Sequence, residues 1–469
     1  MAETGLKRGV LTFWEVVFLS VIAIFPGSIY LISSTTALTF AGEAAPLTFI
    51  LGTILMFFNV IAVYVFSTKV VNAGGFYKYV QAATGNAMLS RWTAFIQLLS
   101  QLSPVIISAS VFGWLIPLTS STLFNVTLPA YVPFVASFLV ILYVFLISYF
   151  GIKLSARVAI AVGLAQIIFI LIAGIIIVVK TPYNSLQVFN IANSSGGLYG
   201  FFYGMLTGPV TAYIGYSSVV HFSEEAKFSK STMKKAIVTA ILISGAFETF
   251  IMYAITVGVP PSQLSSLASS YAPAMVVTER YTNLFFAILV LAIAMLGQLT
   301  SPLTFGNASE RIVYALSRDG VLPKSFTKVH PKYGTPTLAT IFVFIFATLA
   351  SVLTQLIFVY YFGVLTGFFF AVVFWATILP VFNLTYHMIV NESLPFLMRK
   401  LKELNVIKHV LGPTLGSVLI VLVLYYTITG ISYPFNYTIP IIIIWALIGA
   451  VIAYLKRKVP LSVSDVGES

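Results

Sequence analysis

The chain has 469 residues, of which 59% are hydrophobic and 8% are charged. Soluble domains are about 25% charged, and a soluble fold of this length exposes too much surface to water for so few charges. The composition therefore excludes a soluble globular protein. The formal charge of +12 does not indicate a nucleic-acid partner, because the basic residues lie in short segments between apolar runs. The chain has no cysteine, which excludes disulfides, thiol catalysis and cysteine-ligated metals.

Apolar runs long enough to cross a bilayer follow one another along the chain. Since a membrane-spanning helix needs about 20 residues, we predict an all-α integral membrane protein with about twelve transmembrane helices. They are expected at residues 13–40, 45–67, 93–118, 132–150, 157–180, 198–222, 234–259, 284–306, 337–353, 359–388, 408–430 and 437–456. The ninth and tenth share one apolar stretch, 337–389, in which we expect a turn near Thr354 and Gln355. No soluble domain is expected, so residues 1–469 form one transmembrane domain.

Lys and Arg are concentrated in alternate loops. With the N-terminus placed in the cytoplasm, all of the 25 Lys and Arg residues except Lys180 and Arg280 fall in segments on the inner side. Inner loops of membrane proteins carry such an excess of basic residues. We therefore predict a multi-pass protein of the plasma membrane with both termini in the cytoplasm, including the tail 457–469.

Two of the predicted spans contain helix-breaking residues in their middle. The first contains Pro26 and Gly27, and the sixth contains Gly208, Pro209 and Gly215. Proline lacks the amide hydrogen that a helix needs, and glycine relaxes the backbone, so both spans are expected to be broken. Either break alone is typical of an ordinary proline kink. Breaks five spans apart, however, indicate a five-helix unit that is repeated in inverted orientation.

The two repeats would cover residues 13–180 and 198–388, with two additional helices in 408–456. In transporters built this way the substrate binds between matching broken helices. Free backbone amides there can hold a carboxylate. The predicted substrate-binding residues are Ile24, Pro26, Gly27, Ser28, Thr211, Ala212, Ile214 and Gly215.

Loop motifs after the second, fourth, sixth and eighth spans resemble those of a known family. They are residues 72–80 (NAGGFYKYV), 151–157 (GIKLSAR), 222–225 (FSEE), and 307–311 (NASER) with 317–323 (SRDGVLP). In this order they are similar to segments of the amino acid–polyamine–organocation (APC) transporters. The resemblance implies two inverted five-helix repeats, two further C-terminal helices, and substrate bound between broken helices one and six. Pro26-Gly27-Ser28 stands where the family has Gly-Ser-Gly, and Thr211 stands where it has a bulky aromatic gate, which indicates a wider pocket.

The resemblance also supplies candidates for ion coupling. Thr300 and Ser301 align with the region where sodium-coupled members of this architecture place hydroxyl ligands. Carbonyl groups of Ile22 and Phe25 would complete such a sodium site. The alternative is that these hydroxyls bond only to their own helix.

Two polar residues bear on proton coupling instead. Gln166 stands where several proton-coupled relatives carry a lysine, and its other interpretation is an interhelical hydrogen bond. Glu248 lies in the middle of the seventh span, where an ionisable side chain is costly and is by default a functional candidate. It is expected either to relay protons or to be a protonated structural carboxyl. Sodium is preferred over protons as the coupling ion, and exchange without an ion stays open; no metal site and no cofactor are expected.

Together these features predict a secondary active transporter, an ion-coupled symporter or an exchanger, that moves amino acids by alternating access. A polyamine or other organic-amine carrier is the alternative, and the lack of acidic residues at the two breaks argues against it. A channel or receptor is less well supported, because no selectivity filter or ring of charges is recognisable. No catalytic motif indicates an enzyme. The expected partners are an amino acid and the lipid bilayer, with monomer and homodimer both open.

Overall fold

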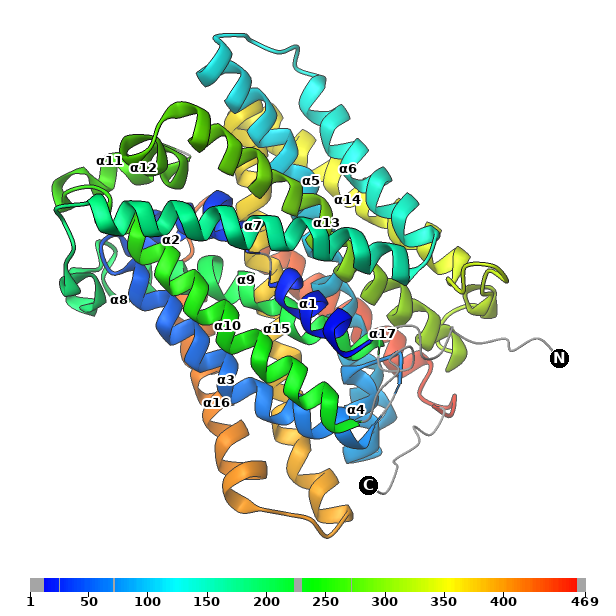
Figure 1. Cartoon of the computed structure of the whole chain (residues 1–469). Coiled ribbons are helices and arrows are strands. Elements are labelled where there is room, and N and C mark those ends of the chain that lie inside the picture. Colours follow the sequence, from blue (N-terminus) through cyan, green and yellow to red (C-terminus); the bar gives the residue numbers. More distant parts are fainter. Residues whose placement is uncertain (1–11, 25, 71, 223–229, 271, 462–469) are drawn as a thin grey trace.

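The computed structural model describes residues 12–461 except for residues 25, 71, 223–229 and 271. In this part the chain is helical (Figure 1), and an isolated bridge pairs Gly42 with Ser194. Ten of the described helices are long and apolar enough to cross a membrane. The prediction of an all-α, multi-pass membrane fold is therefore confirmed.

The helices are connected mostly by short loops and by 3-10 or π-helical turns. In chain order they are α1 (Phe13–Ala23), α2 (Ser34–Ala41), α3 (Ala45–Lys69), α4 (Phe76–Thr84), α5 (Ala87–Phe124), α6 (Val132–Tyr149), α7 (Ile152–Lys180), α8 (Gly197–Met205), α9 (Thr211–Tyr213), α10 (Lys230–Val257), α11 (Leu264–Ala268), α12 (Pro273–Tyr281), α13 (Leu284–Arg318), α14 (Thr337–Phe362), α15 (Val364–Lys400), α16 (Gly412–Gly430) and α17 (Thr438–Leu455). The first and sixth predicted spans are not among the ten membrane-crossing helices, because each is divided into shorter pieces.

The turn expected near Thr354 and Gln355 is wrong. Both residues lie inside α14, and the chain turns at Gly363, whose φ of 76° favours glycine. The Thr354 hydroxyl accepts a hydrogen bond from Trp375 Nε1 at 3.2 Å, and Gln355 Nε2 donates to Ser110 Oγ at 3.1 Å. The polar pair that resembled a loop in the sequence thus joins neighbouring helices.

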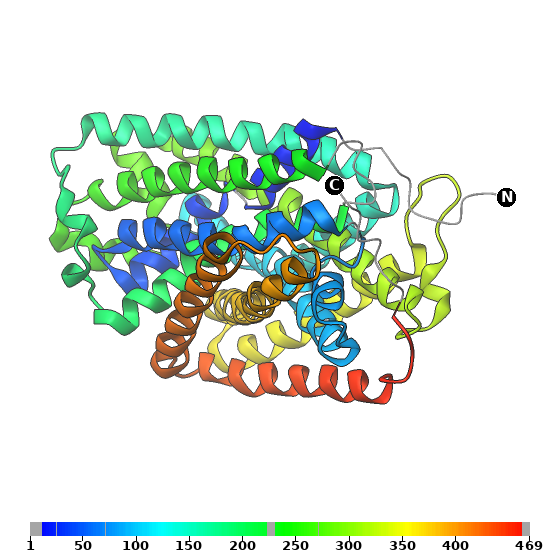
Figure 2. The ribbon, with the colours of Figure 1, turned by 90° about the horizontal axis from the view of Figure 1, so that it is seen from below.

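The bundle is built around α5 and α15, which pack against each other in its middle. In the most apolar 18-residue stretch of each helix, the buried share is 78% for α5 and 72% for α15. The corresponding share is 17% for the segment that contains α17. Figure 2 shows α17 along the outer edge of the bundle, and α16 packs on α3, α8 and α15. The last two helices are therefore peripheral additions to the bundle.

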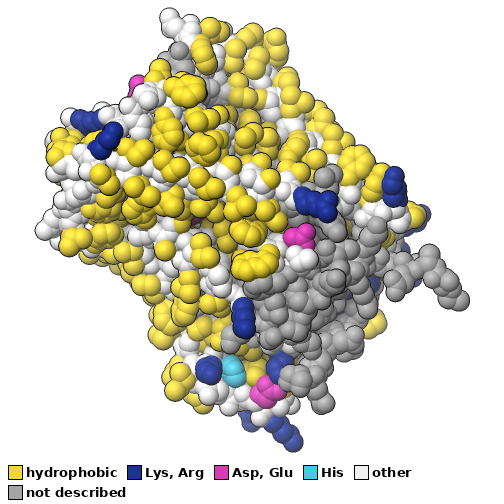
Figure 3. All heavy atoms as spheres, viewed as in Figure 1, with side chains coloured by type: hydrophobic (Ala, Val, Ile, Leu, Met, Phe, Trp, Pro, Cys, Tyr) yellow, Lys and Arg dark blue, Asp and Glu magenta, His cyan; other side chains and the backbone are white. Residues whose placement is uncertain are grey.

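Loops that the sequence assigned to one side of the membrane do meet in the structure. At one end, which we call the basic end, Lys69 pairs with Glu403 at 2.9 Å and Arg318 Nη2 donates to Asn72 Oδ1 at 3.1 Å. At the other end Lys180 Nζ donates to the carbonyl oxygen of Tyr281 at 3.0 Å. Figure 3 shows a broad area of hydrophobic side chains on one face, with Lys and Arg side chains at its upper left and on its right and lower sides, a distribution typical of a membrane-spanning protein.

Candidate functional site

The first apolar segment is interrupted between α1 and a π-helical turn at Ile29–Ser33. The Ile24 amide still donates to the Ser20 carbonyl at 3.2 Å, and helical bonding resumes where the Tyr30 amide donates to the Gly27 carbonyl at 3.2 Å. Pro26 has no amide hydrogen, so the helical ladder cannot run through this point. The break predicted from the sequence is present at this place.

The sixth segment changes helix type but stays helical from Gly197 to Phe222. After α8 come a π-helical turn (Leu206–Val210), α9 and a 3-10 helix (Ile214–Phe222). The prediction that this helix is interrupted is therefore wrong, because its pieces differ in helix type but follow one another without an unwound stretch. Pro209 lacks an amide hydrogen, and the wider π-helical turn accommodates it. The Thr211 hydroxyl donates to the Leu206 carbonyl at 2.7 Å and so supplies a hydrogen bond beside the proline.

A small cavity of about 50 Å³, which we call the central cavity, lies where these two segments meet α5, α13 and α15. Its described lining consists of Ser28, Ile32, Ser33, Pro104, Ile107, Ser108, Thr207, Thr211, Ala212, Gln298, Ser301, Phe305, Ala376 and Leu379. Three of the predicted substrate-binding residues, Ser28, Thr211 and Ala212, are brought together here. Ser301, predicted as a sodium ligand, lines the same cavity.

The other predicted substrate-binding residues lie elsewhere. Pro26 lines a second cavity, of about 340 Å³, formed by residues of α7 and α10 together with Val21. Ile24, Gly27, Ile214 and Gly215 are buried, and the described lining of the central cavity does not include them.

Sequence reasoning missed most of the polar groups of the central cavity. Gln298 Oε1 accepts a hydrogen bond from Ser108 Oγ at 2.8 Å, while Gln298 Nε2 has no partner in the described part of the chain. Ser33 Oγ donates to Ser28 Oγ at 3.1 Å. An amide side chain in the middle of an apolar span was the available sequence signal for Gln298. The cavity therefore offers a buried donor without charge.

The proposed sodium ligands are only partly brought together. Thr300 Oγ1 donates to the Gly297 carbonyl at 3.1 Å, within its own helix, and is 1% exposed. Ile22 is fully buried and packs on Gly163 of α7. Phe25 lies outside the described residues. The sodium site stays a prediction.

Gln166 and Glu248 are both buried within the bundle. Gln166 Nε2 donates to the Ile293 carbonyl at 3.3 Å, which joins α7 to α13. Glu248 is 1% exposed, and neither of its carboxyl oxygens has a hydrogen-bond partner in the described part of the chain. Gln166 thus makes the interhelical contact that the sequence left as its alternative role, whereas no described residue forms a hydrogen bond with the Glu248 carboxyl group.

Comparison with known proteins decides the family. A family model for amino acid permeases matches residues 11–453, nearly the whole chain. The chain belongs to the amino acid permease family. This permease is therefore a transport protein and not an enzyme, and the APC resemblance of its loop motifs is confirmed.

Individual relatives are more distant. The permease is 26% identical to the branched-chain amino acid permease BcaP of Bacillus subtilis over 380 residues, which cover 76% of each chain. It is 25% identical to cationic amino acid transporter 4 of Mus musculus over 76% of this chain and 56% of that protein. A shorter match, 29% identical over 31% of this chain and 33% of the relative, is with the low-affinity putrescine importer PlaP of Escherichia coli strain K12.

Proposed function

We propose that this permease is a secondary active transporter that carries neutral amino acids across the plasma membrane by alternating access, as a symporter or an exchanger. The observation that carries the proposal is the central cavity. Its described lining has hydroxyl and amide side chains but no Asp, Glu, Lys, Arg or His. A zwitterion brings its own paired charges, which helix-end amides and carbonyls can hold. The apolar wall of Ile32, Ile107 and Phe305 suits an aliphatic side chain.

The size of the cavity supports alternating access. One water needs about 10–15 Å³ of such space, so the roughly 50 Å³ of this cavity is too small for an amino acid. Ligand pockets of about 300–1,000 Å³ are usual. A closed form of the carrier would account for this small volume, and the first and sixth segments would then have to separate for substrate to enter.

The same proposal includes the membrane topology. The ten long helices together with the divided segments 13–41 and 197–222 make twelve spans. Their division at the first and sixth positions supports inverted repeats at 13–180 and 198–388, with α16 and α17 added. The basic end then faces the cytoplasm, with both termini on that side.

A second candidate is a carrier of cationic amino acids or polyamines. The names of two relatives, cationic amino acid transporter 4 and the putrescine importer PlaP, favour it. The uncharged cavity disfavours it, because a substrate with excess positive charge needs a carboxylate partner in a site shielded from water. The name of BcaP, by contrast, agrees with neutral branched-chain substrates.

Competition in proteoliposomes tests the proposal. Purified permease should accumulate labelled leucine above the level of protein-free liposomes. Excess unlabelled isoleucine or valine should reduce that uptake, whereas arginine, lysine and putrescine should not. If only the cationic compounds are transported or compete, neutral amino acids are not the substrates of this cavity.

A further inference from the structure

We propose that His221 is the gate residue that closes the central cavity toward the basic end, and that it must leave Ala73 and Gln97 before the carrier can open there. The proposal rests on the transport function proposed above and adds the residue that controls access from one side. Three features of the structure carry it: the hydrogen bonds of the His221 ring, its packing on Gly75, and its position between the cavity and the basic end.

Both ring nitrogens of His221 are bonded to other elements of the bundle. His221 lies near the end of the 3-10 helix Ile214–Phe222 and is fully buried. Its Nδ1 lies 3.1 Å from the Ala73 carbonyl oxygen, and its Nε2 lies 2.7 Å from Gln97 Nε2. A carbonyl oxygen can only accept, so Nδ1 donates to Ala73 and Nε2 of the neutral ring accepts from the Gln97 amide. One side chain thus joins the sixth segment to the loop before α4 and to α5.

The His221 ring packs directly on Gly75. A Cβ atom at Gly75 would lie 2.4 Å from Cε1 and 2.7 Å from Nδ1 of the ring, closer than real Cβ atoms approach. The φ of Gly75 is 63°, which also favours glycine. Phe76 follows, and its ring centroid lies 6.2 Å from that of His221. The loop before α4 therefore leaves room for the imidazole only because residue 75 has no side chain.

His221 lies between the central cavity and the basic end. The described lining of the cavity includes Ala212 of the sixth segment, and His221 follows it in the same helical segment. At about 1.5 Å per α-helical residue and 2.0 Å per 3-10 residue, His221 lies roughly 17 Å beyond Ala212. Its partner Ala73 is next to Asn72, which accepts the hydrogen bond from Arg318 at the basic end. The His221 contact is therefore part of the wall that separates the cavity from that end.

Aromatic rings form the rest of this wall. Tyr216 lies between Ala212 and His221 in the sequence and stacks on His387 of α15, with ring centroids 5.7 Å apart. The Phe76 ring contacts His387, at 5.0 Å between centroids. Tyr216, His387 and Phe76 are all fully buried. Ring contacts are lost gradually as elements separate, whereas hydrogen bonds weaken steeply with distance and angle, so the His221 bonds hold the closed position.

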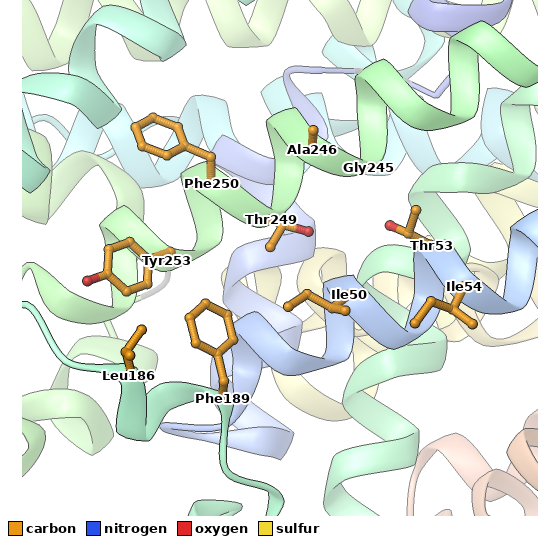
Figure 4. A pocket seen from close by; sticks show the side chains of 10 residues that line it. All are labelled: Ile50, Thr53, Ile54, Leu186, Phe189, Gly245, Ala246, Thr249, Phe250 and Tyr253. Atoms are coloured by element: carbon orange, nitrogen blue, oxygen red, sulfur yellow. The ribbon is translucent and has the colours of Figure 1, made fainter.

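The contacts of the sixth segment divide between two groups of helices. In its middle, the Tyr213 hydroxyl is hydrogen-bonded to Thr53 Oγ1 at 3.1 Å. Figure 4 shows Thr53 on α3 and Thr249 on the neighbouring helix α10. The helices α3 and α10 pack on each other, whereas α4 packs on α5 and α15. Movement of the sixth segment together with α3 and α10 keeps the Tyr213 bond and breaks both bonds of His221, which opens the basic end.

Side-selective labelling of a cysteine in the cavity tests the proposal, because the chain has no cysteine of its own. The parent variant is Ala376→Cys, which places a thiol in the described cavity lining. Vesicles of both orientations are treated with a membrane-impermeant thiosulfonate without substrate, and Lys328→Cys, at an exposed position of the basic end, reports which side that end faces. His221→Leu in the parent should raise the labelling rate from the basic end on the order of fivefold, the factor by which loss of one net hydrogen bond shifts an equilibrium. Labelling from the opposite side should not rise.

Three further variants separate these hydrogen bonds from general packing. His221→Asn keeps an amide donor near the position of Nδ1 and should label close to the parent rate. Gln97→Leu leaves Nε2 without its donor, so labelling from the basic end should rise, and its effect should not add to that of His221→Leu. Gln355→Leu is the matched control, because Gln355 is a fully buried glutamine whose bonds to Ser110 and Ser351 do not involve the sixth segment. It should leave both labelling rates unchanged.

The remaining outcomes also decide the question. Equal rises from both sides in His221→Leu would show general loosening and overturn the gate role, as would an unchanged rate from the basic end. If His221→Leu does not reach the membrane, Gln97→Leu decides, because the parent rate in that variant contradicts the proposal. Labelling needs no substrate, so a wild type that carries no amino acid removes the proposed function but leaves this test of the gate intact.

Discussion

Lys78 Nζ lies 2.7 Å from Asp319 Oδ2, and both side chains are fully buried. The Tyr77 hydroxyl donates to the same carboxylate at 3.0 Å, and Lys78 Nζ also donates to Gln81 Oε1 at 3.0 Å. Lys78 is on α4, after the second predicted span, and Asp319 caps the end of α13, the eighth. Two loop motifs that are 241 residues apart in the chain are thus joined by one ion pair at the basic end.

We expect Asp319→Asn to destabilise the permease strongly. The variant leaves the Lys78 ammonium buried without its counter-charge, which costs about 3–5 kcal/mol. Glu403→Gln is the matched control, because its pair with Lys69 is partly exposed, at 10% and 47% of the two side chains, and such pairs contribute about 0–1 kcal/mol. Thermal unfolding in detergent should show a clear loss for Asp319→Asn and little change for Glu403→Gln. Equal stability of the two variants would contradict this reading of the buried pair.

Gln298→Leu is expected to weaken substrate binding. The change removes the Nε2 donor, which is buried in the cavity without a partner in the described residues. KM for leucine should therefore rise, while the amount of protein inserted in the membrane should change little. Gln355→Leu serves as the control, since Gln355 is a fully buried glutamine outside the described cavity lining. Its loss of hydrogen bonds to Ser110 and Ser351 should lower thermal stability but leave KM unchanged. A rise in KM in the control alone would place the site elsewhere.

Thr211→Phe should narrow the substrate range. Thr211 lines a cavity of about 50 Å³, and a phenyl group there takes up space that large substrates need when the cavity widens. Alanine and glycine uptake should survive better than leucine uptake, measured side by side in proteoliposomes. Thr429→Phe on α16, where the threonine is exposed, should leave the ratio of the two uptakes as in the wild type. An unchanged ratio in Thr211→Phe would show that this side chain does not face the substrate.

Uptake is expected to be the same in sodium and choline media. Thr300 Oγ1 donates to the Gly297 carbonyl of its own helix, and the described lining of the central cavity includes Ser301 but not Thr300. Thr300→Ala should therefore leave uptake unchanged in both media. Sodium-stimulated uptake that Thr300→Ala removes would restore the sodium site that we predicted from the sequence.

The absence of cysteine allows a direct test of topology. Gln187 and Lys328 are exposed and lie at opposite ends of the bundle. With the basic end in the cytoplasm, Gln187→Cys should react with a membrane-impermeant maleimide on intact cells, and Lys328→Cys should react only after the membrane is opened. The reverse pattern would invert the proposed orientation.

The sequence predicted the fold better than it predicted the site. The length of a hydrophobic run depends only on the thickness of the membrane, so it predicted the positions of most of the ten membrane-crossing helices that the structure describes. The turn at Gly363 was missed because Thr354 and Gln355 look like loop residues until Trp375 and Ser110 are known to lie beside them. Periodicity along one helix carries no information about its neighbours.

The sequence alone determined that this chain is a multi-pass membrane permease, and it predicted a substrate site near the first and sixth segments. Composition, basic-loop bias and loop motifs are local properties, and Pro26 and Pro209 disturb a helix wherever it lies. Only the tertiary structure decided which side chains share the cavity, placing Gln298 in it and Pro26 outside it. It also decided that Glu248 is buried without a partner among the described residues. The side chains that one residue meets are set by the packing of helices distant in sequence.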